Sequence, residues 1–183
     1  MIMIQPRQRS AIKGHIFGVR KDSCSCDPCD CNPCKCGDSL LPNYPEWRIS
    51  GYFVQEGISH EQPLSKHMLL GLAQPEQEDS QNWQEVLLVG NDTSLEQIHA
   101  LLALFESDLE SMPAEIEARP EVKRAVYRAS IDYHMTEQGP HLRATFSPEP
   151  ANLVREGSAQ QAIRAWTYDG LTRLRGTFHM ASL

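Results

Sequence analysis

The sequence has no long apolar run. No stretch approaches the roughly eighteen apolar residues that a membrane-spanning helix needs, so we expect a soluble protein with no membrane partner. The segment Met1-Ile2-Met3-Ile4 gives way to polar residues at Gln5, without the apolar core of a secretory signal. We therefore expect a reducing, cytoplasmic setting. The net charge of −7 argues against nucleic acid as a partner.

The common catalytic signatures are also missing. There is no His-Glu-x-x-His, no Gly-x-Ser-x-Gly, no glycine-rich loop for phosphate and no dinucleotide fingerprint. The seven histidines are scattered along the chain. We expect His99 to be a solvated residue on a helix, and His15 to be a candidate nitrogen ligand for a neighbouring metal site. The sequence predicts no catalytic residue, and an enzyme is the less favoured interpretation.

Cysteine is absent everywhere except between residues 24 and 36. A five-residue motif begins there three times, and each copy has a Cys-x-Cys pair followed by a turn. In an extended chain residues i and i+2 point to the same side, so each pair presents two sulfurs together. Pro28 and Pro33 hold the residues before them out of the helical conformation. The pattern predicts a folded-back ribbon that binds soft metal ions through Cys24, Cys26, Cys29, Cys31, Cys34 and Cys36.

Three interpretations of the cysteine cluster compete. Three disulfides would close very small loops, which gain little unfolded-state entropy and strain the bond geometry. Thiol redox chemistry would use a Cys-x2-Cys pair such as Cys26/Cys29 or Cys31/Cys34, but redox thiols usually lie at a helix N-terminus, which the prolines disfavour. Metal binding is favoured because six thiolates among acidic neighbours repel one another until a cation binds.

The favoured metals are Zn(II) and Cu(I). A structural zinc ion takes four thiolates, commonly from two Cys-x2-Cys hairpins. Cys26/Cys29 and Cys31/Cys34 have that spacing, but they leave two sulfurs over. The Cys-x-Cys pairs look more like the thiolate-bridged clusters of metallothioneins. An iron–sulfur cluster ranks third because its ligands usually lie farther apart in sequence.

The rest of the chain has the patterns of a globular body. Strands are predicted at residues 10–19, 47–54, 85–89, 125–135 and 141–146, with a turn at 138–140 and one or two short strands within 166–180. The apolar run 64–72 is too short to assign as helix or strand. A capping box at Thr93/Glu96 or Ser94/Gln97 begins a helix. Its core-facing stripe is predicted to be Leu95, Ile98, Leu101, Leu102, Phe105 and Leu109.

These elements predict an α+β fold, a mostly antiparallel sheet packed by one principal helix, with an N-terminal cysteine-rich metal-binding ribbon. Residues 1–40 would form the N-terminal strand and the ribbon, and residues 41–183 the globular body, within one continuous domain. Gly14 and Gly18 indicate a bulge or a close backbone approach in the first strand. Trp83 and Trp166 are expected to be core anchors.

Several of these motifs occur in the order found in a known family. Gly14-His15-Ile16-Phe17 runs into Cys24-Ser25-Cys26-Asp27 and a further cysteine pair; Asn82-Trp83, the helix start at Thr93-Ser94-Leu95-Glu96-Gln97 and Ile131-Asp132-Tyr133 follow. Over most of residues 11–155 the chain resembles the domain-of-unknown-function 1326 family. The resemblance implies an N-terminal cysteine site on an α+β body and supplies no reaction. This chain departs from the family in lacking its Cys-Pro-Cys and in compressing its cysteines into three pairs.

The sequence therefore predicts a soluble protein that holds Cu(I) or Zn(II) in a six-cysteine thiolate site, for buffering, delivery or structural ordering. Metal ions are the expected partners, with a protein partner as a further option. One alternative is a thiol–disulfide oxidoreductase that uses a Cys-x2-Cys pair. Another is a zinc-stabilised interaction subunit of a larger assembly.

Overall fold

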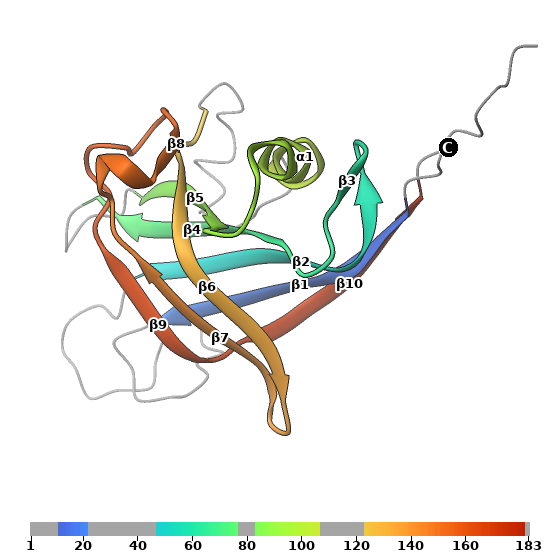
Figure 1. The fold of residues 1–183 in the computed structure, drawn as a ribbon. Helices are drawn as coiled ribbons and strands as arrows, with labels where there is room; N and C mark the ends of the chain where they lie inside the picture. The colour runs from blue at the N-terminus through green and yellow to red at the C-terminus, as the bar shows by residue number, and fades with distance from the viewer. Residues whose placement is uncertain (1–10, 22–46, 77–82, 107–122, 182–183) are drawn as a thin grey trace, which may run out of the picture.

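The computed structural model describes residues 11–21, 47–76, 83–106 and 123–181 (Figure 1). The first half of this part holds β1 (Ala11–Lys21), β2 (Trp47–Ser59), β3 (Gln62–Pro63), β4 (Met68–Pro75), β5 (Trp83–Gly90) and α1 (Leu95–Phe105). The second half holds β6 (Val126–Thr136), β7 (Gly139–Phe146), the 3-10 helix η2 (Pro150–Asn152), β8 (Leu153–Arg155), β9 (Trp166–Leu171) and β10 (Arg173–Ala181). The run at residues 64–72, which the sequence left unassigned, therefore contributes mainly to a strand.

The ten described strands form one sheet that curls on itself (Figure 1). Its main path is β10-β1-β2-β4-β5-β6-β7-β9, with β3 paired to β2 and β8 paired to β6. Neighbouring strands are antiparallel except β5 and β6, which are parallel. The two ends of this path, β9 and β10, are separated in sequence only by Thr172. Because the sheet is curled, the chain passes directly from one edge to the other.

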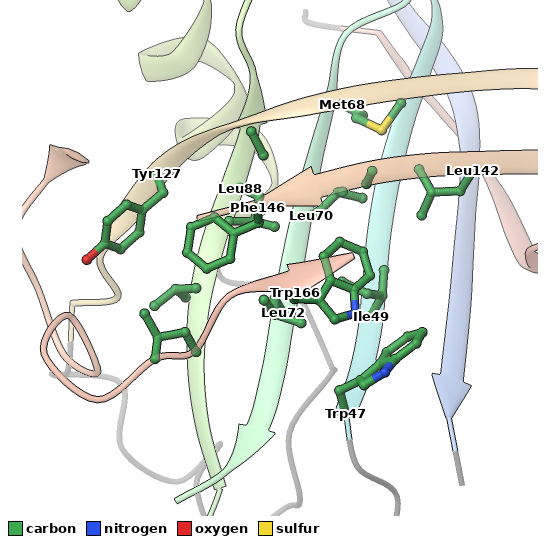
Figure 2. Close-up of a cluster of buried hydrophobic side chains, with 14 of the residues drawn as sticks. Trp47, Ile49, Met68, Leu70, Leu72, Leu88, Tyr127, Leu142, Phe146 and Trp166 are labelled. Atoms are coloured by element: carbon green, nitrogen blue, oxygen red, sulfur yellow. The ribbon is translucent and has the colours of Figure 1, made fainter. Parts of the chain in front are cut away.

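The concave side of the curled sheet encloses a core of its own, which we call the inner core. Side chains of β2, β4 and β5 meet those of β6, β7 and β9 there (Figure 2). The alternation of strand side chains places every second residue on this side. Its buried members include Phe17, Trp47, Ile49, Met68, Leu70, Leu72, Val86, Leu88, Tyr127, Leu142, Phe146 and Trp166.

The helix α1 covers part of the opposite, convex side and completes a second core, the outer core. Ser94 caps the helix: its hydroxyl accepts a bond from Gln97 N, and the Gln97 side chain accepts one from Ser94 N. The predicted Ser94/Gln97 capping box is therefore confirmed. Leu95 is 54% exposed, against the prediction that it faces the core, and Leu109 lies outside the described residues. The outer core includes Ile12, Tyr52, Val54, Leu69, Leu87, Val89, Ile98, Leu101 and Phe105.

The predicted α+β fold, with the sheet packed by its helix, is wrong. The described residues are mostly strand, with one α-helix, and the sheet forms a half-barrel. The strands β6, β7 and β9 fold over the concave side of β1, β2, β4 and β5 and take the role that helices have in an α+β domain. Curling buries the concave face without a helix, so α1 is needed only on the convex side.

An ion pair and a hydrogen bond fasten the end of α1 to the sheet. Glu106, which follows the helix, pairs with the guanidinium of Arg155 in β8. Arg124 Nε lies 2.9 Å from the buried Glu85 carboxylate of β5, and an Arg124 guanidinium nitrogen also donates to the Glu106 backbone carbonyl. The helix end is thus held by charge-assisted bonds as well as by the outer core.

Candidate functional site

The six cysteines predicted as metal ligands, Cys24, Cys26, Cys29, Cys31, Cys34 and Cys36, lie outside the described residues. Their segment connects β1 to β2, and its two flanking residues are fixed. Lys21 at the end of β1 is the register partner of Trp47 at the start of β2. The chain therefore leaves the sheet and re-enters it at neighbouring positions. The division at residue 40 stays a prediction, although β1 itself lies between β2 and β10 in the sheet.

Aromatic side chains pack around Trp47, the residue at which the chain re-enters the sheet. The Trp47 ring meets Trp166 and Tyr168 of β9 edge-on, with 5.3 Å between ring centroids in each case. Trp47 and Trp166 are buried in the inner core, where Figure 2 shows them side by side. The next residue, Arg48, places its guanidinium 4.9 Å from the ring centroid of Trp83 in β5. Trp83 and Trp166 are both buried, which confirms their predicted place in the core.

His15, the candidate nitrogen ligand, has a different partner. Its Nε2 lies 2.6 Å from the Tyr133 hydroxyl of β6, on the concave side of the sheet. The Phe53 ring is 5.2 Å away, and Phe17 stacks on Tyr133 at 4.6 Å. His15 also lies six residues before the end of β1, which corresponds to roughly 20 Å of strand. This histidine joins opposite walls of the half-barrel and is far from the point where the cysteine segment begins.

Burial sets the protonation of this pair. It lowers the pKa of His15 below its ordinary value of 6.5, because a charged imidazole is poorly solvated there. It raises the pKa of Tyr133, against the opposing effect of a hydrogen bond with Thr172. Both groups are therefore neutral at neutral pH, and the phenol can donate to the imidazole. The sequence alone did not identify Tyr133 as a partner of His15. Tyr133 and Ile131 are two residues apart in β6, so their side chains lie on the same face of the sheet.

The described residues do not bring a set of three metal ligands together. They contain no group of three or more His, Cys, Asp or Glu side chains that could hold a metal ion. In the same part of the chain, no helix is long and apolar enough to cross a membrane. His99, expected to be solvated, is exposed on α1. The candidate thiolate ligands are thus supplied by the segment between β1 and β2.

Comparisons with known proteins add no relative. No family model matches the chain, and neither a curated protein nor a solved structure matches it. The resemblance to the domain-of-unknown-function 1326 family stays a prediction from the motifs, and the function is argued from the residues themselves.

Proposed function

We propose that this protein binds soft metal ions, Cu(I) or Zn(II), through the six thiolates of Cys24, Cys26, Cys29, Cys31, Cys34 and Cys36 in a reducing, cytoplasmic setting. The observation that carries the proposal is the threefold Cys-x-Cys repeat, which gathers every cysteine of the chain between residues 24 and 36. Thiolates are the side chains that these ions prefer. The ions are cargo for buffering or delivery, or they order the segment that holds them.

The folded body supports this role by fixing both flanks of the cysteine segment. Lys21 and Trp47 are paired in the sheet, and Trp47 is packed against Trp166 and Tyr168. The connection formed by residues 22–46 is far longer than the two to five residues usual between two paired antiparallel strands. Holding the ends of the segment together reduces the entropy lost when its thiolates gather around an ion.

Metal content per chain is the direct test. The full chain would be purified anaerobically, and its copper and zinc measured by elemental analysis together with an absorption spectrum. The same measurement on a chain with all six cysteines changed to serine removes the thiolates, and the double variant Ser23→Ala/Ser25→Ala is a control within the same segment. Far-UV circular dichroism checks that each variant keeps its strands.

We expect several copper or zinc ions per chain in the unaltered protein and in the serine-to-alanine control, and none at this site in the six-serine variant. Equal metal content in all three chains would refute the proposal. A metal-free chain with reversibly oxidised thiols would refute it in favour of a thiol–disulfide oxidoreductase. A single redox-silent zinc with a concentration-dependent mass would replace the cargo role with that of an interaction subunit.

A further inference from the structure

Histidine and aspartate side chains gather on the outer surface of β6, β7 and β9, on the side opposite the inner core. His134 of β6 and His141 of β7 are register partners beside the hairpin turn that joins these strands. Their rings are 5.4 Å apart between centroids and are inclined by 31°. This end of the hairpin extends beyond the neighbouring strands (Figure 1). The His134 side chain is 52% exposed and the His141 side chain 28% exposed, so solvent and ions reach both imidazoles.

A carboxylate orients the His141 imidazole and leaves its second nitrogen available, and another carboxylate lies near His134. His141 Nε2 lies 2.5 Å from Asp169 Oδ1 of β9, and His134 Nδ1 lies 3.5 Å from Asp132 Oδ2. Among the described residues, no hydrogen bond uses His141 Nδ1 or His134 Nε2. A carboxylate on one imidazole nitrogen is the usual arrangement when the other nitrogen binds a metal, because it fixes the tautomer and the ring.

The separation of the rings suits a tetrahedral ion. An ion bound at about 2.0–2.1 Å from a ring nitrogen lies roughly 3.2 Å from the centre of that ring. Two ring centres 5.4 Å apart then subtend an angle of about 115° at the ion, close to the tetrahedral value. Water would have to complete the coordination, because the described residues contain no group of three or more His, Cys, Asp or Glu side chains that could hold a metal ion.

We infer that His134 and His141 together bind one divalent transition-metal ion of the class that prefers imidazole, such as Zn(II), with Asp169 orienting His141. The site uses no cysteine, so it is independent of the proposed thiolate site. Experiments can therefore refute either proposal without refuting the other. Arg143 Nε lies 4.0 Å from the other Asp169 oxygen, and both side chains are largely exposed.

The test uses Zn(II) itself on the full chain with all six cysteines changed to serine, which removes the thiolates from the measurement. Zinc binding would be followed by calorimetry in this background and in three single variants, His134→Ala, His141→Ala and Asp169→Asn. His99→Ala, which removes an exposed histidine of α1, is the matched control. A second measurement needs no variant: the unaltered chain is saturated at its thiolates, and further Zn(II) is added while the imidazole nitrogens are observed by NMR.

We expect one Zn(II) per chain in the six-serine background, at least tenfold weaker binding in each histidine variant, and about tenfold weaker binding for Asp169→Asn. The His99→Ala control should bind as the background does. In the unaltered chain, the resonances of His134 and His141 should shift together after the thiolates are filled. Equal binding by all variants, or shifts spread over every exposed histidine, would show an adventitious ion only and overturn the inference.

Discussion

The close packing around Gly14 of β1 provides a sharp test of how this strand is held. Gly14 is buried between β2 and β10, opposite Val54 and Phe178, and the register with β2 shifts between Lys13 and Gly14. A Cβ atom added at Gly14 would lie 1.9 Å from the Phe53 carbonyl oxygen and 2.6 Å from the Phe178 ring. The bulge or close approach that the sequence indicated at this glycine is therefore confirmed. Because the nearest obstacle is backbone, Gly14→Ala can be accommodated only if β1 and β2 move apart.

The expected loss of folding stability depends on which atoms the added Cβ atom would displace. Overpacking a buried position costs about 1–3 kcal/mol, and a backbone obstacle places Gly14→Ala near the upper end, at about 3 kcal/mol. Gly18→Ala would meet the Arg175 guanidinium at 2.6 Å, but this exposed side chain can rotate away, so we expect a loss below about 1 kcal/mol. At Gly176 in β10 the added atom meets no heavy atom of the described residues within 4 Å. Gly176→Ala should be neutral or stabilise by about 0.4–1 kcal/mol, through the unfolded state.

Urea unfolding followed by tryptophan fluorescence measures all three variants under one condition. The slope of the free energy against urea should stay constant, so that the midpoints report stability alone. In thermal unfolding, each kcal/mol should correspond to roughly 2–4 °C in a chain of this size. The expected order of destabilisation is Gly14→Ala, then Gly18→Ala, then Gly176→Ala. If Gly14→Ala matched Gly176→Ala, the close approach of β1 to the Phe53 carbonyl would be refuted.

Two further predictions concern the two sides of the sheet. Because burial lowers the pKa of His15, the unfolded chain takes up a proton at higher pH than the folded one, and stability should fall as the pH drops below 6.5 toward the folded pKa. His15→Phe should reduce this loss in urea midpoints measured at pH 7.5 and 5.5, and an unchanged loss would assign it to other groups. On the convex side, Phe105→Ala should cost about 3–5 kcal/mol, since this ring is 1% exposed and stacks on Tyr52 at 4.5 Å. Leu95→Ala, at an exposed helix position, should cost less than about 0.5 kcal/mol, and thermal unfolding that gave equal losses would contradict the packing of α1.

Local chemistry in the sequence was enough to predict most elements. The Ser94/Gln97 pair marks the start of α1 because a short polar side chain and a glutamine three residues later satisfy exposed helix N–H groups. The strands that became β1, β2, β5, β6 and β7 were all predicted from their residue patterns; most ends agree within two residues, but β2 continues to Ser59, five residues past its predicted end. The run at residues 64–72 resisted assignment for a physical reason. All residues of β4 are buried, since the inner core covers one face and the outer core the other, and this removes the alternation that identifies a strand.

The architecture depends on pairings that no local pattern specifies. The parallel contact of β5 with β6 and the antiparallel contact of β1 with β10 join segments far apart in sequence, and together they curl the sheet. The candidate zinc site shows the same limit at a smaller scale. The sequence predicted a turn at residues 138–140, whereas the structure turns at 137–138. A one-residue shift in a hairpin changes which side chains face each other, so the pairing of His134 with His141 required the observed register.

The place of β10 beside β1 has a consequence for the order of events during synthesis. The strand that leads into the cysteine segment is completed on one side by β2, soon after translation, but on the other side only by residues 173–181. At about 5–20 residues per second, these last partners emerge roughly 7–30 seconds after the cysteines. During that interval the thiols exist on a nascent chain whose sheet is not yet closed. In that period the closed half-barrel does not yet exist, so β10 cannot help to hold the flanks of the cysteine segment.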